Sequence, residues 1–169
     1  MKLNIGCGTD YRHGFYNIDG SDALPRVDKV INLSEESLLA SFDPGCADFI
    51  LANDIVEHFF HWEAVRLLQD CYALLCPRGR LEMRIPDAEF IINTQKHSVE
   101  WKLTWLFGGQ DIPQGHSSKM DESRKDFPQF FCHKYGWTRK SMKDALLTVG
   151  FSQVVCERIG SNFRAVAVR

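Results

Sequence analysis

Two features near the start of the chain could together hold a nucleoside. Gly6 and Gly8 flank Cys7 directly after a short apolar run, and the next apolar run ends in Asp19. Glycine tolerates positive φ and, because it has no Cβ, lets a ligand lie against the backbone amides. A carboxylate at the end of the following strand could accept hydrogen bonds from both hydroxyls of a ribose. The alternative is that the glycines only turn the chain and that Asp19 only caps the loop.

Histidine supplies the candidates for a general base, since an unperturbed imidazole titrates near neutral pH. His58, His116 and His133 are these candidates, and the alternative for each is a hydrogen-bonded or surface histidine. Glu57, His58 and His61 also suggest a metal site, because residues three and four apart share a helix face. The chain has no H-E-x-x-H motif and no further ligand is apparent, so we expect the start of a capped helix and no metal.

Three arginines alternate along one apolar run and offer a further chemical possibility. Arg78, Arg80 and Arg84 could bind a phosphate on a substrate. The same alternation is typical of a strand that shows one edge or face to solvent. We favour the second interpretation.

Alternating apolar runs and helical patterns must position these residues. We expect strands over residues 2–5, 15–18, 29–33, 47–52, 80–85, 151–158 and 163–168. We expect helices over 61–75, 90–106 and 139–149, and a short helix around Leu38 and Leu39 with Ser34 as its N-cap. Gly160-Ser161-Asn162 predicts a hairpin turn, which makes the last two strands antiparallel. The polar run 110–129 reads as a loop, either a lid or a disordered segment.

Composition limits the class of protein. The chain has 169 residues, of which 44% are hydrophobic and 25% charged, and this predicts one soluble globular domain. A net charge of −2 argues against nucleic acid as a partner. No apolar stretch approaches the roughly 20 residues that span a bilayer. The first residues lack the pattern of a secretory signal, and the six cysteines lack zinc-site spacing, so we expect a cytoplasmic protein with reduced thiols.

Five segments in order along the chain carry a family resemblance. They are LNIGCG (3–8), GFYNID (14–19), DKVINL (28–33), ADFILANDIVEHF (47–59) and LCPRGRL (75–81). This series resembles class I S-adenosylmethionine-dependent methyltransferases, most closely the small bacterial members often associated with cell-surface glycan synthesis. The resemblance implies an α/β, Rossmann-like fold: a seven-stranded, mostly parallel sheet with its last strand antiparallel and helices on both faces. Residues 1–169 would form one domain, with an insertion or lid at about 87–137.

The resemblance also implies which residues hold the cofactor, S-adenosylmethionine. Gly6, Cys7 and Gly8 would approach its methionine and ribose part, with Cys7 contributing its backbone more than its thiol, and Asp19 would hold the ribose hydroxyls. Asn32 and Leu33 would lie beside the adenine, and Asn53 and Ile55 would contact the methionine moiety. Glu57 and His58 would then open the rim of the substrate cleft.

The sequence departs from the family pattern in two places. Only eleven positions separate Gly8 from Asp19, which leaves no room for the helix that normally joins the first two strands. A loop must make this crossover. The chain also begins almost at the first strand, without the N-terminal helical segment that covers the site in many relatives, and this leaves the role of a lid to residues 110–129.

The sequence therefore predicts a methyltransferase for a small acceptor, with a hydroxyl of a sugar or glycan precursor as the acceptor that the resemblance suggests. His133 is placed slightly ahead of His58 as the general base. A hypothesis from another class is a catalytically inactive binding or scaffold module that keeps the fold. A nicotinamide dehydrogenase is disfavoured, because Tyr11 stands where its third glycine is needed. The oligomeric state is not predicted.

Overall fold

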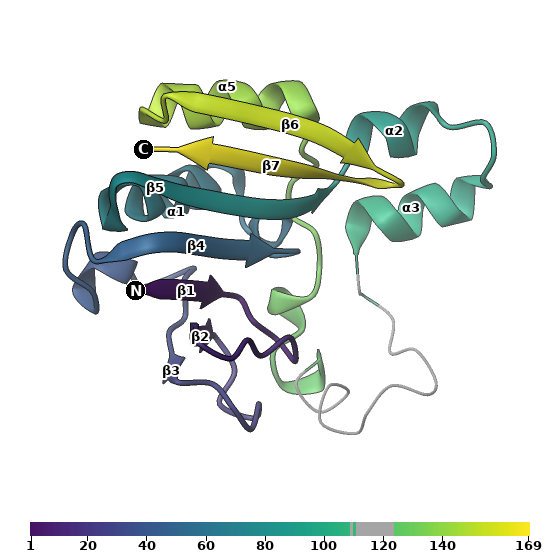
Figure 1. Ribbon diagram of the computed structural model, residues 1–169. Coiled ribbons are helices and arrows are strands. Elements are labelled where there is room, and N and C mark those ends of the chain that lie inside the picture. The colour runs from purple at the N-terminus through teal and green to yellow at the C-terminus, as the bar shows by residue number, and fades with distance from the viewer. Residues whose placement is uncertain (109, 111–123) are drawn as a thin grey trace.

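A seven-stranded sheet forms the centre of the protein in a computed structural model that describes residues 1–108, 110 and 124–169 (Figure 1). The strands are β1 (Lys2–Ile5), β2 (Tyr16–Asp19), β3 (Lys29–Val30), β4 (Ala47–Asn53), β5 (Leu75–Pro86), β6 (Gln153–Ile159) and β7 (Asn162–Val168). Their order is β3-β2-β1-β4-β5-β7-β6. Strands β1 to β5 are parallel, and β7 runs antiparallel to both of its neighbours. This confirms the predicted sheet and its antiparallel last strand.

Helices with clear local start and stop signals flank the sheet. They are α1 (His61–Leu74), α2 (Ala88–Asn93), α3 (Val99–Phe107) and α5 (Arg139–Val149), together with the 3₁₀ turns η1 (Leu38–Ala40), η2 (Val56–His58) and η3 (Pro128–Phe130). Helix α5 begins as predicted, with the Thr138 hydroxyl accepting a 3.0 Å hydrogen bond from the Ser141 amide. It ends at Gly150, whose φ of 122° suits glycine. None of the described helices is long and apolar enough to cross a membrane.

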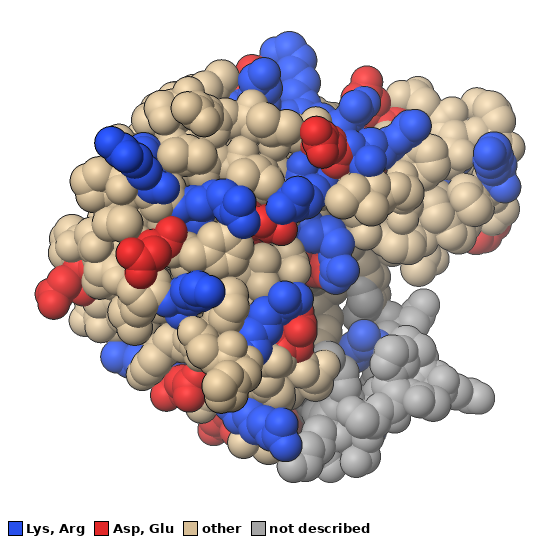
Figure 2. All heavy atoms as spheres, viewed as in Figure 1, with Lys and Arg blue, Asp and Glu red and all other residues tan. Residues whose placement is uncertain are grey.

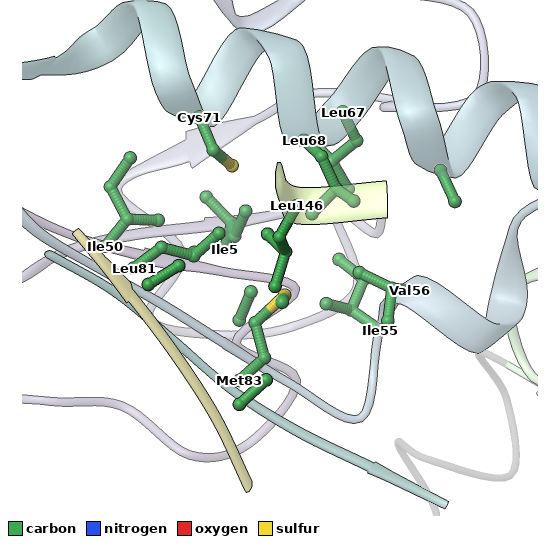
Figure 3. Packing of buried hydrophobic residues seen from close by; sticks show 14 of the residues in the cluster. Ile5, Ile50, Ile55, Val56, Leu67, Leu68, Cys71, Leu81, Met83 and Leu146 are labelled. Atoms are coloured by element: carbon green, nitrogen blue, oxygen red, sulfur yellow. The ribbon is translucent and has the colours of Figure 1, made fainter. Parts of the chain in front are cut away.

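The core lies between the sheet and the two long helices, α1 and α5, which pack against each other and against the same face of the sheet (Figure 1). Figure 3 shows Leu68 and Leu146 reaching from these helices towards Ile50, Leu81 and Met83 of the central strands. All five side chains are buried. Burying each stabilises the fold by roughly 1.5–3 kcal/mol, so the core holds β4 and β5 and the loops after them in fixed positions.

The opposite face of the sheet is open to solvent among the residues that the structure describes. Arg80 and Arg84 of β5 are exposed on it, and Glu82 between them forms two 2.8 Å hydrogen bonds with Arg164 of β7. Figure 2 shows Lys and Arg side chains gathered over this face with Asp and Glu between them. The two long helices, α1 and α5, therefore share the other face of the sheet. A loop without a helix joins β1 to β2, as the short spacing between Gly8 and Asp19 predicted.

Three boundaries in the first half of the chain differ from the sequence expectation. Ser37, and not Ser34, caps the short 3₁₀ turn, because its hydroxyl accepts a 3.1 Å hydrogen bond from the Leu39 amide. Strand β3 ends at Val30, since Asn32 turns the chain by accepting a 3.2 Å side-chain hydrogen bond from the Ser34 amide. Strand β5 begins at Leu75, directly after α1, and is therefore longer than the predicted strand 80–85.

The predicted helix 90–106 is two helices. The Asp87 carboxylate caps α2 by accepting from the Phe90 amide at 3.3 Å, and the Ser98 hydroxyl caps α3 by accepting from the Trp101 amide at 3.2 Å. Thr94, which ends α2, is extended at ψ 133°. A second N-cap within a continuous apolar pattern therefore divides the segment, and periodicity by itself does not show such a break.

Candidate functional site

The loops that follow β1, β2 and β4 enclose a cavity of about 480 Å³ at the carboxyl edge of the sheet. This is the edge at which open α/β sheets bind ligands. The residues predicted from the sequence all line it: Gly6, Cys7, Gly8, Asp19, Asn32, Leu33, Asn53, Ile55, His58 and His133. The fold thus brings the predicted cofactor and base residues to one place, while the role of each stays a prediction.

The glycine turn and Asp19 form one hydrogen-bonded unit at the end of β1. The Gly8 amide donates to Asp19 Oδ2 at 2.8 Å, and the Ser21 amide donates to Oδ1 at 3.1 Å. Burial raises the pKa of Asp19, and hydrogen bonds from the amides of Gly8, Ser21 and Gly20 oppose this shift. A carboxylate has about four acceptor positions, so these three amides leave about one of them for a ligand. Asp19 therefore caps the loop and can also bind a ligand, so the two interpretations of this residue are compatible.

The positive φ angles of Gly6 (62°) and Gly8 (51°) explain why glycine occupies both positions. At Gly6 a Cβ would stand 2.2 Å from Ile55 Cδ1, because the loop after β4 packs directly on the turn. At Gly8 no atom of the described residues lies within 4 Å of the place where a Cβ would stand. The space over Gly8 belongs to the cavity.

Cys7 lies between these glycines with its thiol buried. Its amide donates to the Ile18 carbonyl at 3.0 Å and holds β1 and β2 together where they end. Burial, with a smaller contribution from Asp19, raises the pKa of Cys7 to about 12. The thiol stays protonated at neutral pH and is a poor nucleophile, which agrees with a backbone role for this residue.

Aromatic residues that follow the undescribed segment form a wall that the sequence did not predict. Phe130 and Phe131 line the cavity, and the Phe130 ring would lie 3.2 Å from a Cβ at Gly20. The predicted lid 110–129 falls mainly on residues 111–123, which lie outside the described residues. A run of aromatic residues at 127–131 was the available signal for this wall.

An ion pair on the rim was also missed. The Arg84 guanidinium donates two hydrogen bonds to the Asp54 carboxylate. The one from Nε to Oδ1 measures 3.0 Å. The Asp54 amide in turn donates to the Arg84 carbonyl at 2.8 Å, and Asp54 has a φ of 51°. Of the three alternating arginines, only Arg84 lines the cavity. Arg80 instead lies over the Phe49 ring, as expected for an exposed strand face.

His58 and His133 come from distant parts of the chain and meet at the cavity, with ring centroids 4.9 Å apart. His58 Nδ1 lies 3.1 Å from the Cys132 carbonyl oxygen, and His133 Nδ1 lies 2.9 Å from the Trp105 carbonyl oxygen. A carbonyl oxygen can only accept, so each Nδ1 carries a proton and each neutral ring has its lone pair on Nε2. Burial, with the neighbouring His133, lowers the pKa of His58 to about 4, and burial lowers the pKa of His133.

Glu57 lies beside these rings and is 2% exposed. Burial, with Asp54 adding to the effect, raises the pKa of Glu57 to about 8. His61 does not join the group, because it begins α1 and stacks on Trp137 with centroids 5.3 Å apart. His116 lies outside the described residues.

No family model and no curated protein sequence matches the chain. Solved structures do. A methyltransferase dependent on S-adenosylmethionine from Archaeoglobus fulgidus is 14% identical, with a TM-score of 0.64 over 99% of this chain and 85% of that one. Another from Methanosarcina mazei is 16% identical, with a TM-score of 0.63 over 99% and 91%. The fold is that of the S-adenosylmethionine-dependent methyltransferases.

A further neighbour with this fold was solved with its ligands. It is the 1,6-didemethyltoxoflavin-N1-methyltransferase of Burkholderia thailandensis, with 1,6-didemethyltoxoflavin and S-adenosylhomocysteine bound. It is 14% identical, with a TM-score of 0.60 over 99% of this chain and 70% of that one. At such identities the likeness to the methyltransferase fold concerns the backbone, so the chemistry of this chain has to be argued from its own residues.

Proposed function

We propose that the protein is a methyltransferase that binds S-adenosylmethionine in the cavity at the carboxyl edge of the sheet and methylates a small acceptor. The observation that carries the proposal is the unit formed by the glycine turn and Asp19, placed on the edge of a methyltransferase fold. Structural neighbours that depend on the same cofactor support it. The neighbours give no support to the alternative of an inactive scaffold.

The residues around the cavity fit this cofactor. The volume of the cavity, about 480 Å³, lies within the range of roughly 300–1,000 Å³ for small-molecule sites. The space over Gly8, free of atoms of the described residues, admits a ligand against the backbone, and Asp19 keeps an acceptor position for a ribose hydroxyl. Asn32 and Leu33 would lie beside the adenine. Gly6, Cys7, Asn53 and Ile55 would hold the methionine part.

The chemistry that the cofactor supplies is an activated methyl group: a bond from carbon to the acceptor forms as the carbon–sulfur bond breaks, leaving S-adenosylhomocysteine and releasing the acceptor proton. The protein's main task is to hold the acceptor in line. For a hydroxyl acceptor, the Nε2 lone pair of His133 or His58 would take the proton, since both rings are neutral at pH 7. His133 comes first and His58 second in this proposal.

The acceptor we propose is a small molecule, in particular a hydroxyl of a sugar or glycan precursor. A neighbour with a small-molecule substrate supports the first part. The second part rests on the family resemblance of the sequence. A net charge of −2 and the mixture of charges in Figure 2 argue against a nucleic-acid acceptor.

Calorimetric titration with S-adenosylmethionine and S-adenosylhomocysteine tests the cofactor site. We expect micromolar binding to the wild type, its loss in Asp19→Ala, and no change in Asp22→Ala, which alters an exposed carboxylate of the same loop that does not line the cavity. Failure of the folded wild type to bind either compound contradicts the proposal and favours the scaffold hypothesis.

Methyl transfer assayed across sugar nucleotides, nucleic acids and proteins tests the acceptor class. Methylation of small sugar-containing compounds supports the proposal. Reaction with the macromolecules alone contradicts it.

A further inference from the structure

The three side chains of Glu57, His58 and His133 offer ligand atoms that all lie within 4.8 Å of one another. Two are imidazoles and one is a carboxylate. We propose that these residues form a binding site for a divalent transition-metal ion of the zinc type, in the wall of the cavity. From the sequence, His61 was the third member of a possible metal site, and we expected no metal. In the structure His133, and not His61, lies beside Glu57 and His58.

The state of Glu57 points to a missing partner. Its side chain is buried, and neither Oε1 nor Oε2 has a hydrogen-bond partner within the part of the chain that the structure describes. A buried carboxyl group without a partner costs several kcal/mol if it is charged, and such a group in a native protein indicates an ion or a water molecule. Arg84, the nearby cationic group, is not the partner of Glu57, because it is bonded to Asp54.

The imidazoles are oriented as metal-binding imidazoles are. In metal sites the nitrogen that does not bind the ion donates to a backbone carbonyl or carboxylate, which fixes the ring and its tautomer. His58 Nδ1 faces the Cys132 carbonyl and His133 Nδ1 faces the Trp105 carbonyl. Both Nε2 atoms are therefore left as acceptors, free to bind an ion.

The backbone around the group is held independently of any ligand. The Lys134 amide donates to the Glu57 carbonyl at 2.8 Å, and the His133 amide donates to the Phe107 carbonyl at 2.8 Å. These bonds join η2, the end of α3 and the segment after η3. Gly108 completes the arrangement, because a Cβ there would stand 2.5 Å from His133 Cδ2. The three side chains thus start from a prepared position.

The ligand types select the ion. Two imidazole nitrogens and one carboxylate oxygen suit zinc and neighbouring first-row ions, whereas magnesium and calcium prefer oxygen ligands throughout. Bonds of about 2.0–2.2 Å place the ligands of a tetrahedral ion roughly 3.3–3.6 Å apart. Separations of up to 4.8 Å require the side chains to close by about an ångström when the ion binds.

Three protein ligands leave a coordination position open. His58 and His133 line the cavity, so that position would be reached from the side where the acceptor enters. A part of the ion in catalysis rests on the proposed methyl transfer. An acceptor hydroxyl bound at the open position of the ion would lose its proton to solvent more readily. An Nε2 atom that binds the ion cannot also act as the base, so metal binding and base catalysis by these histidines exclude each other.

Metal titration of tag-free, chelator-treated protein tests the site. Zinc binding is measured by calorimetry, and cobalt is titrated in parallel because its visible absorption reports nitrogen and oxygen ligands. The variants are Glu57→Gln, which keeps the shape of the side chain, and His133→Gln. The matched control is His61→Phe, which removes a nearby imidazole but keeps a ring to stack on Trp137. Thermal unfolding and S-adenosylhomocysteine binding are recorded for every protein.

We expect one zinc ion per chain, affinity reduced at least tenfold in Glu57→Gln and His133→Gln, and wild-type affinity in His61→Phe. No binding, or equal affinity in all the variants, overturns the proposal. Binding that His61→Phe weakens as much as the others overturns it too. If the protein binds S-adenosylhomocysteine but does not bind zinc, the metal site is refuted and the proposed function stays intact. If it binds zinc but not S-adenosylhomocysteine, the metal site is supported and the proposed function is contradicted.

Discussion

Gly8 and Gly14 provide a matched pair for testing whether a ligand lies on the glycine turn. Both have positive φ angles, 51° and 80°, and within the described part of the chain neither has an atom within 4 Å of the place where a Cβ would stand. They differ in one respect, since Gly8 lines the cavity and Gly14 does not. Replacing each by alanine therefore adds the same strain and the same atom in two different places.

The strain is the same in kind for both variants. Forcing alanine into the left-handed region costs roughly 1–2 kcal/mol. For a chain of 169 residues this corresponds to a fall in Tm of about 2–8 °C. The added methyl group of Gly8→Ala also occupies space that the proposed cofactor would fill, so we expect a further loss of at least about tenfold in its affinity, or roughly 1.4 kcal/mol.

Thermal unfolding without ligand measures the first effect, and calorimetric titration with S-adenosylhomocysteine measures the second. We expect similar falls in Tm for the two variants and weaker binding in Gly8→Ala alone. If both variants bind the ligand as tightly as the wild type does, the idea that the ligand lies against Gly8 is refuted. A loss of affinity in Gly14→Ala of the same size would show that backbone strain, and not occupied space, is responsible.

Three further outcomes follow from the structure. Gly6→Ala should lower Tm by more than either variant above, because its Cβ would meet Ile55 Cδ1 at 2.2 Å in addition to the strain; an equal fall in Tm would contradict this. Hydrogen bonds from Arg164 hold the pKa of Glu82 below its usual 4.5, so its stabilising effect is present above that pH and is lost as the pH falls through the lowered value. Glu82→Gln should then reduce the free energy of unfolding at pH 7 by only about 1 kcal/mol, since Arg164 is partly exposed to screening solvent, and the difference should shrink as the pH falls below 4.5, as urea unfolding would show. Burial raises the pKa of the Cys71 thiol, so iodoacetamide should modify it only in denaturant and modify the partly exposed Cys132 in the folded protein, a contrast that peptide mass spectrometry would detect.

The sequence by itself determined those features that depend on neighbouring residues. Alternating apolar runs located all seven strands, and the helical pattern over 139–149 gave the bounds of α5 correctly. Glycine at positions 6 and 8 followed from the need for positive φ after a strand, and Asp19 from its place at the end of the next strand. Such features are encoded by local conformational preference and by the periods of strands and helices.

The tertiary structure alone decided which distant residues meet. His133 reaches His58 and Glu57 because backbone hydrogen bonds return its segment to η2 after the chain has passed through α2 and α3. Sequence spacing had offered His61, which shares the neighbourhood of Glu57 along the chain but stacks on Trp137. The pairing of Arg84 with Asp54 and the placement of both long helices on one face likewise depend on strand order and packing. Contacts across the fold are set by how elements pack, and the spacing of residues in one element carries no information about them.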